Sequence, residues 1–457
     1  MIRACLIALC GLAFLASSAT AQLPDEASVA GKCMTCHKEK HPGLYQQWYE
    51  SAHGIHNVTC ISCHKADEDD PDAYEHYDAT IATLVTPKDC GRCHEKEAEQ
   101  VSNSYHAKAG QILDSADAYL AHVGAGHPAA IQGCESCHGA KMEIDPESPN
   151  KLSKTSWPNS GIGRINPDGS LGSCNACHTR HSFDIAQSRQ PESCGKCHLG
   201  PDHPQMEIYE ESKHGNTYYT NREKMNLAAQ EWVVGEDYNV APTCATCHMS
   251  ATRTQDFTHD VGERIAWTNR PVISKHKENH VQKRTAMQDV CLACHGDTFA
   301  DGHFYQYDAS VKLYNEKFAK PAQDIMNKIK EKDLLETPAA FSNDVEWAFW
   351  ELWHHEGRRA RHGASMMGPD YTWWHGFYDV LHNFYFDFLP KAREYGDSEV
   401  NGMIDDLLQN DPMHQWVMTD TETLKRRINE GTMQEVFVNM FDAYIEAEAR
   451  EDEEGTE

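Results

Sequence analysis

The sequence has very few cysteines outside one repeated pattern. Of its 18 cysteines, all but Cys5 and Cys10 stand in pairs separated by two residues. No cysteine beyond residue 21 is left over for a disulfide framework or a free thiol. A secreted scaffold held together by disulfide bonds is therefore excluded.

Basic residues are also few. Lysine and arginine together number 41, against 70 aspartates and glutamates, and the formal net charge is −29. Such an acidic chain repels phosphate backbones, which excludes nucleic acid as a partner. It suits a basic protein partner such as a cytochrome c, although most surface charge is simply solvated.

Long apolar runs are absent. The apolar run from Ala4 to Leu15 follows Arg3 and precedes the small-residue stretch Ala19-Thr20-Ala21. It is too short to span a bilayer, and its order is that of a cleavable secretory signal. We therefore expect residues 1–21 to be a signal peptide, with the mature chain in the periplasm and without a transmembrane segment.

One motif, Cys-x-x-Cys-His, is present eight times. Its two cysteines can each form a thioether to a haem vinyl group, which holds the histidine under the iron as its proximal ligand. A single copy could be half of a zinc site, but eight copies predict eight c-type haems. The attachment residues are Cys33, Cys36, Cys60, Cys63, Cys90, Cys93, Cys134, Cys137, Cys174, Cys177, Cys194, Cys197, Cys244, Cys247, Cys291 and Cys294. The proximal histidines are His37, His64, His94, His138, His178, His198, His248 and His295.

So many haems in one chain leave few residues for each of them. The chain is therefore predicted to have a mainly α fold, that of a multihaem cytochrome c in which helices and loops wrap the haems. No cysteine follows His295, and the rest of the chain predicts a C-terminal helical bundle. The many aromatic residues in this region are typical of the core of such a bundle or of a subunit interface. The expected helices cover 311–335, 343–367, 372–395 and 421–449. The expected divisions are a signal peptide (1–21), an octahaem-binding domain (22–309), a C-terminal helical domain (310–450) and an acidic tail (451–457).

Two segments read as loops. Residues 65–78 are strongly acidic and predict a solvated loop. Residues 139–173, between the fourth and fifth motifs, are rich in proline and glycine. They predict an irregular loop longer than ordinary connections, either functional or covering a haem.

Further histidines recur at positions suited to distal iron ligands. Three segments repeat a Ser-x-His pattern that ends at His53, His106 and His214, and His53 and His127 both stand seven residues before the first cysteine of a motif. His181 and His259 are further candidates. The alternative for each candidate is an ordinary surface or core histidine that binds no iron. Together with His362, which is introduced below, there are seven candidate distal ligands for eight irons. One iron is therefore expected to have an open sixth coordination position.

Two longer segments carry a family resemblance. Arg358 to Tyr378 reads RRARHGASMMGPDYTWWHGFY, and Cys194 to Gly215 reads CGKCHLGPDHPQMEIYEESKHG. With the eight motifs in the same order, the chain resembles the octahaem hydroxylamine oxidoreductases (hydroxylamine dehydrogenases). The resemblance implies that the fourth haem, on Cys134, Cys137 and His138, is catalytic and lacks a distal protein ligand. It also implies a homotrimer in which Tyr371 of a neighbouring subunit is bonded covalently to that haem.

The stretch Asp202-His203-Pro204, followed by a segment ending in Lys213-His214-Gly215, is similar to the active-site stretch of pentahaem nitrite reductases. That similarity implies that Asp202 and His203 are the acid–base pair over the open haem. The alternative is that Asp202 caps a helix that begins at a proline. His362 stands twelve residues after Trp350, as a distal histidine does in those reductases.

The resemblance implies oxidation of hydroxylamine to nitric oxide or nitrite, with electrons leaving through seven bis-histidine haems to a cytochrome c. Tyr371 favours this direction, because relatives that lack the tyrosine are linked to reduction of nitrite or hydroxylamine. Hydrazine dehydrogenase and a reverse-acting reductase are the alternatives within the family. An octahaem electron carrier without a substrate is the alternative from another class.

Overall fold

The computed structural model describes residues 23–114 and 119–454, and for 112–114 and 445–454 it describes the backbone alone. It is mainly helical, with 57% helix and few strands, which confirms the predicted fold class. The predicted signal peptide and its two cysteines lie outside the described residues. Among the described residues, no helix is both long and apolar enough to cross a membrane.

The chain divides into two compact units. The first contains residues up to 98 together with 106–184, and the second contains 99–105 together with everything from 185 onwards. Five haem motifs therefore belong to the first unit and three to the second. The domain boundary expected at residues 309 and 310 falls inside a continuous helix, Asp297–Tyr314. The last cysteine marks the end of haem attachment rather than the end of a packed unit.

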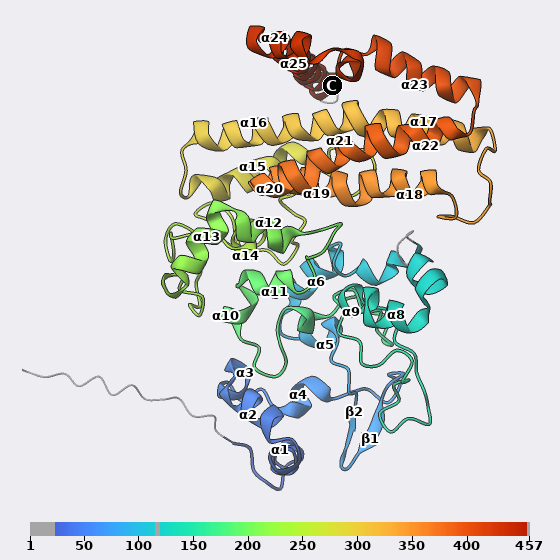
Figure 1. Ribbon diagram of the computed structural model, residues 1–457. Coiled ribbons are helices and arrows are strands. Elements are labelled where there is room, and N and C mark those ends of the chain that lie inside the picture. Colours follow the sequence, from blue (N-terminus) through green and yellow to red (C-terminus); the bar gives the residue numbers. More distant parts are fainter. Residues whose placement is uncertain (1–22, 115–118, 455–457) are drawn as a thin grey trace, which may run out of the picture. The chain divides into compact units, whose positions relative to one another are not determined.

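The first unit consists of short helices, one hairpin and long irregular connections (Figure 1). Its elements are α1 (Val29–Lys40), α2 (Pro42–Glu50), α3 (Ala52–Ile55), α4 (Cys60–His64), β1 (Tyr74–His76), β2 (Ala79–Ile81), α5 (Pro87–Cys90), α6 (Glu95–Asn103, which continues into the second unit), η1 (Ala109–Asp114), η2 (Ala121–Ala125), α8 (His127–Gln132), α9 (Cys134–His138) and η3 (Cys174–Ala176).

Several haem motifs form a single helical turn of their own, as in α4 and α9. The reason is local: Thr59 caps α4, and its backbone N–H donates to Ser62 Oγ at 3.1 Å, so the helix begins at Cys60. A helical turn brings residues three apart to the same face. Both cysteines of a motif can therefore reach one haem.

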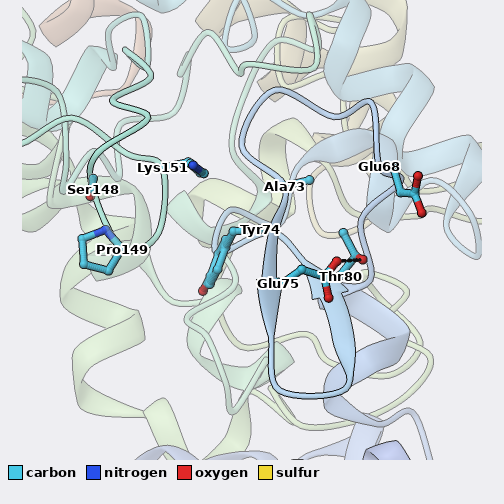
Figure 2. A pocket seen from close by; sticks show the side chains of 8 residues that line it. All are labelled: Glu68, Ala73, Tyr74, Glu75, Thr80, Ser148, Pro149 and Lys151. Carbon is cyan, nitrogen blue, oxygen red and sulfur yellow. Dashed lines mark hydrogen bonds between the residues drawn. The ribbon is translucent and has the colours of Figure 1, made fainter.

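The acidic segment 65–78 is not entirely a loop. Its end forms β1, which pairs antiparallel with β2 in the register Tyr74↔Ile81 and His76↔Ala79. Beside this hairpin lies a groove of about 540 Å³ (Figure 2). The groove is lined by Glu68, Ala73, Tyr74, Glu75, Thr80, Ser148, Pro149 and Lys151. None of these eight residues belongs to a haem motif.

The segment 139–173 is irregular, as predicted, with a few isolated bridges between its residues. Its centre is Arg164, whose side chain is fully buried. Arg164 donates from Nε to Asn166 Oδ1 at 2.6 Å, and from Nη2 to the carbonyl of Val85 at 3.0 Å. Polar bonds around a buried arginine, rather than a regular ladder, hold this segment together.

The second unit adds longer helices. Its elements are α10 (Ile185–Ser188), α11 (Pro191–Gly195), α12 (Gln205–Glu211), α13 (Lys213–Thr220), η4 (Arg222–Lys224), α14 (Cys244–His248), α15 (His280–Leu292), α16 (Asp297–Tyr314), η5 (Asn315–Ala319), α17 (Lys320–Glu331), α18 (Asp344–Trp350), η6 (Glu351–Glu356), α19 (Gly357–Ser365), α20 (Pro369–Thr372), η7 (Trp373–Tyr378), α21 (Asp379–Asn383), η8 (Phe384–Phe388), α22 (Leu389–Glu394), α23 (Ser398–Asn410), η9 (Gln415–Met418), α24 (Thr421–Glu430) and α25 (Thr432–Glu454).

Four C-terminal helices were expected, and two of them are found with nearly the expected bounds. Residues 344–365 form α18–η6–α19, and 369–394 form α20 to α22; within this unit the two rods lie beside α16–α17 (Figure 1). The first expected helix begins earlier, at Asp297. The last is broken at Gly431, which adopts the left-handed conformation (φ +81°) that ends α24.

Helix α23 was not predicted. Asp397 caps it by accepting hydrogen bonds from the N–H groups of Glu399 and Val400. Its buried Val400 and Ile404 complete the largest apolar core, which also contains Ile325, Ile329, Phe384 and Phe388. Four stretches of these C-terminal helices, η5 to η8, are π-helical, a form that often marks functional sites.

Candidate functional site

The sixteen motif cysteines are all free of disulfide bonds, and each is half-buried or exposed. Thioether attachment needs free sulfur atoms that a haem can reach, so this arrangement fits the predicted cofactor. The positions of the histidines give a further test of whether haem fits.

Three proximal histidines are held by their Nδ1 atoms. Nδ1 of His64 donates to the carbonyl of Ala82 at 2.9 Å, and Nδ1 of His248 donates to that of Val261 at 3.1 Å. Nδ1 of His198 donates to Gln205 Oε1 at 3.2 Å. Such bonds fix the ring and leave Nε2 as the atom available to a metal.

Three distal candidates each face a proximal histidine. The ring centroids are 6.1 Å apart for His53 and His94, 6.3 Å for His181 and His64, and 6.1 Å for His214 and His295. An iron atom about 2 Å from each of two facing ring nitrogens would separate the centroids by roughly 6 Å. The spacing therefore leaves room for one iron between the rings of each pair.

A fourth pair was missed by the sequence analysis. His76, on β1, lies 6.4 Å from His37, the proximal histidine of the first motif, measured between ring centroids. The only sequence signal for it is a histidine directly before Tyr77-Asp78 within an acidic stretch. His41 also stacks on His37, with centroids 4.9 Å apart.

Two histidines lie near the sixth proximal histidine, His198. The centroid of His203 is 6.1 Å from that of His198. His362 is half-buried; desolvation lowers its pKa, and His198 is among the nearby charges that lower it further. Since both lie near His198, only one of them can be the distal ligand of the iron on His198. The sequence analysis expected His362 to be a distal ligand and His203 to be an acid–base group.

The remaining three distal candidates have other neighbours. The His127 ring stacks on His122, with centroids 5.4 Å apart. The backbone N–H of His259 donates to Gln100 Oε1 at 2.9 Å, and its ring lies 5.5 Å from that of Phe257. His106 is half-buried in the turn that follows α6.

Burial lowers the pKa of several of these histidines, which favours the neutral form that binds a metal. It lowers the pKa of His181 to about 4 and that of His362 well below its usual range. Burial also lowers the pKa values of His37, His53, His64, His214 and His248.

The expected acid–base pair is held by an arginine. His203 Nδ1 lies 3.4 Å from Asp202 Oδ1, and Asp202 Oδ2 accepts a hydrogen bond from Arg358 Nη1 at 3.2 Å. Arg358 is itself anchored, because its Nε donates to the carbonyl of Arg270 at 2.9 Å. The Asp202 carboxylate thus lies beside Nδ1 of His203 without a hydrogen bond to it, and the two form an ion pair when His203 is protonated.

Tyr371 is half-buried on α20. Its backbone N–H donates to Glu211 Oε1 at 3.2 Å, and its ring stacks on His375, with centroids 5.2 Å apart. Burial raises the pKa of its phenol. Tyr371 belongs to the second unit, whereas the fourth motif belongs to the first.

The fourth motif is held by the irregular segment that follows it. The N–H groups of Ile162 and Gly163 donate to the carbonyls of Cys137 and His138, at 2.9 and 3.0 Å. A Cβ on Gly161 would lie 2.1 Å from the nitrogen of Gly139, so this close approach requires glycine. The segment therefore fixes the backbone that carries His138.

The seventh motif contacts a buried cation. Arg264, which is 2% exposed, donates from Nη1 to the carbonyl of Cys247 at 3.2 Å and from Nη2 to that of Ser250 at 2.7 Å. Both acceptors are neutral. A full positive charge therefore lies next to the attachment segment of the seventh haem.

Known proteins similar to this chain point to haem redox chemistry. A "Probable nitrite reductase-hydroxylamine oxidoreductase fusion protein" of Kuenenia stuttgartiensis is 28% identical over 248 residues, which cover 48% of this chain and 25% of the relative. The chain thus spans about a quarter of the length of this curated relative. It therefore matches only part of a larger protein.

Two solved structures share the fold. A "Hypothetical multiheme protein" is 26% identical with a TM-score of 0.69, and the match covers 78% of this chain and 93% of the other. A "reducing HAO-like protein complex" of Kuenenia stuttgartiensis is 20% identical with a TM-score of 0.61, covering 82% and 86%. At that identity the second match shows the fold alone.

A family model also matches, described as "Seven times multi-haem cytochrome CxxCH", over residues 56–340. This range contains the second to the eighth motif, and the first, Cys33 to His37, precedes it. The match covers more than half of the chain. The protein belongs to this family of multihaem c-type cytochromes.

Proposed function

We propose that the protein is an octahaem enzyme that oxidises hydroxylamine to nitric oxide or nitrite at the haem attached to Cys134, Cys137 and His138. The observation that carries this proposal is the pairing of His203 with Asp202, which Arg358 holds. A chain that only carried electrons would have no need for an oriented acid–base pair. When bound, c-type haems supply single-electron transfer and, where an axial position is open, a site for a small nitrogen compound.

The histidine pairs support a specific ligand assignment. The observed pairs support His76, His181, His53 and His214 as ligands of the irons of His37, His64, His94 and His295. To these we add, as part of the proposal, His362 for the iron of His198 and His106 and His259 for those of His178 and His248. This gives seven distal ligands for seven proximal histidines and leaves the iron of His138 open. His76 thereby takes the role that the sequence analysis gave to His127.

The acid–base roles follow from the contacts of His203. Its Nδ1 faces the Asp202 carboxylate, so Nε2 accepts a proton as N–H and O–H bonds of the substrate break. Asp202 stabilises the imidazolium that forms, because the negative charge lies 3.4 Å from Nδ1. Arg358 keeps the carboxylate in position.

The proposed role of Tyr371 requires an oligomer, because its bond joins two subunits. In this proposal Tyr371 is bonded to the fourth haem of a neighbouring subunit, within a homotrimer. Four aromatic side chains near it support a protein interface, because they are large and between 42 and 57% exposed. They are Trp373, Trp374, Tyr378 and Phe386.

The location and the electron acceptor follow from the haems and the charge. Covalent haem attachment together with the predicted signal peptide supports the periplasm. The formal net charge of −29 supports a basic cytochrome c as acceptor, because opposite charges steer association.

Reduction of nitrite or hydroxylamine is the second candidate. It is favoured by the names of the relatives, one a nitrite reductase–hydroxylamine oxidoreductase fusion and one a reducing complex. Hydrazine dehydrogenation and pure electron transport are further alternatives, and the assay below separates them from the first proposal.

The test uses purified holoprotein. Oxidation predicts hydroxylamine-dependent reduction of ferricytochrome c, faster than with hydrazine, and one high-spin haem among low-spin ones in the reduced spectrum. Reduction predicts instead that nitrite or hydroxylamine consumes a strong donor while hydroxylamine leaves cytochrome c oxidised. A spectrum of low-spin haems alone, with no turnover in either direction, would make the protein an electron carrier.

A further inference from the structure

Three metal-ligating side chains converge just before and within the fourth motif. They are His122 of η2, His127 at the start of α8, and Glu135, which stands between the two attachment cysteines of α9. One ligand atom from each residue lies within 4.8 Å of the other two. The two histidines are not needed by the ligand assignment proposed above.

The distances suit a single ion. Nδ1 of His122 and Nδ1 of His127 are 3.4 Å apart. Two nitrogens bound at about 2.05 Å to a tetrahedral zinc ion are separated by roughly 3.4 Å. The Glu135 carboxylate is close as well, since its Oε1 lies 3.9 Å from Nε2 of His122. Because Nε2 is the ring nitrogen that does not face His127, a single ion on the two Nδ1 atoms requires the glutamate side chain to turn toward them, and the three ligand atoms lie within 4.8 Å of one another.

The backbone explains why these residues meet. Gly126 separates η2 from α8 and has φ +106°, a conformation that only glycine adopts readily, so the chain reverses between the two histidines. Helix α8 then ends after six residues at Gly133, and Glu135 follows in the next turn. The short helix brings η2 and α9 close together.

The site is open to solvent. The side chains of His122 and Glu135 are 32 and 13% exposed, and His127 is exposed. Both imidazoles and the carboxylate can therefore reach an ion from solution without unfolding. The two histidine rings stack on one another, with 23° between their planes.

We propose that His122, His127 and Glu135 form a binding site for a divalent transition metal of the zinc type. Two imidazoles and one carboxylate are ligands that zinc accepts, and the fourth position is left to water. A bound ion links η2 to the attachment segment of the fourth haem. It therefore stiffens the backbone around Cys134 and Cys137 and adds positive charge beside that haem.

The experiment measures binding of Zn²⁺ to the haem-loaded protein. After treatment with a chelator, the protein is titrated with Zn²⁺ by calorimetry and, separately, by equilibrium dialysis with elemental analysis. We expect a site with one Zn²⁺ per chain that His122→Ala and Glu135→Gln each weaken by about tenfold or more. His56→Ala, which removes an exposed histidine elsewhere in the same unit, should leave this site unchanged.

Zinc X-ray absorption supplies a second readout. The spectrum of the wild type should show two imidazole ligands, and that of His122→Ala only one. Equal zinc affinity in the wild type, His122→Ala and Glu135→Gln would overturn the proposal. It would also be overturned if His127→Ala, measured without metal, turned a low-spin haem high-spin, because His127 would then be an iron ligand. Unchanged haem content in the variants keeps these outcomes separate from misfolding.

Discussion

The imidazole of His76, on β1, faces that of His37, at the end of α1, with ring centroids 6.4 Å apart. The hairpin β1–β2 brings His76 to this position, although the two residues are 39 positions apart in the sequence (76 − 37). In the ligand assignment proposed above, this contact supplies the seventh distal ligand and leaves the fourth haem open.

Replacing His76 with alanine should remove the distal ligand of the first haem. We expect one low-spin haem to become high-spin and to bind carbon monoxide, measured by electron paramagnetic resonance and optical spectroscopy of the purified protein. Tyr77→Ala is the matched control, because Tyr77 is in the same hairpin and 82% exposed. Unchanged spectra for His76→Ala would point to His41 as the ligand of the first haem.

His203 and His362 both lie near His198, but their alanine variants should differ in turnover and in haem spin state. His203→Ala should lower hydroxylamine turnover by about two to four decades, the usual contribution of a general base, with all low-spin haems retained. His362→Ala should instead convert one low-spin haem to high-spin. If the spectral change appears in His203→Ala and not in His362→Ala, the two roles are exchanged.

Tyr371→Phe tests the cross-link. Phenylalanine keeps the bulk of the ring and so preserves packing, but it lacks the phenol oxygen. We expect hydroxylamine oxidation to fall steeply, while reduction of nitrite or hydroxylamine with a strong donor persists or rises. The cross-linked, high-spin haem should give a red-shifted absorption band in the reduced wild type, and this band should vanish in the variant.

Denaturing gels give a further readout of the same variant. Wild-type chains should run as a covalent, haem-staining multimer, and Tyr371→Phe chains as monomers. Separation of the wild type into monomers, with normal oxidation by the variant, would reduce Tyr371 to a packing residue.

Glu356 predicts a pH-dependent stability. Burial raises the pKa of this carboxyl to about 8, although Asn383 Nδ2 donates to it at 3.2 Å. Above pH 4.5, the ordinary pKa of a glutamate, the unfolded chain has released the proton that the folded chain keeps up to about pH 8. Raising the pH through this window therefore favours unfolding.

Glu356→Gln should remove that dependence. The variant should melt at a higher temperature than the wild type at pH 8, and the difference should shrink toward pH 4.5, as measured by circular dichroism. Glu351→Gln, a change at an exposed glutamate of the same segment η6, is the control. If both variants melt alike at pH 8, the folded protein does not retain the Glu356 proton.

The sequence predicts those features that depend on local spacing. A Cys-x-x-Cys-His motif requires only five consecutive residues, so haem attachment and the proximal histidines can be read directly. The helices at 344–365 and 369–394 were also predictable, because their aromatic residues recur along continuous segments. Gly431 and the capped helix at Ser398 depend on backbone conformation and side-chain capping, and there the predicted bounds were wrong.

Facing histidine pairs are harder to predict, because they form between distant segments. His64 and His181 are 117 residues apart (181 − 64) and meet only in the folded unit. His76 was missed because its acidic neighbours suggested a solvated loop, whereas strand pairing turns it back toward α1. His127 shared an offset with His53, yet its ring stacks on His122, since offset alone does not fix direction.

Arg264 has a consequence for the flow of electrons. Its guanidinium is buried and donates to the neutral carbonyls of Cys247 and Ser250, while Glu263 and Asp289 are opposite charges that act on it. A fixed positive charge stabilises the reduced state of a nearby iron and so raises its reduction potential. We therefore expect the seventh haem to be among the easiest to reduce, a place where electrons collect before they leave the protein.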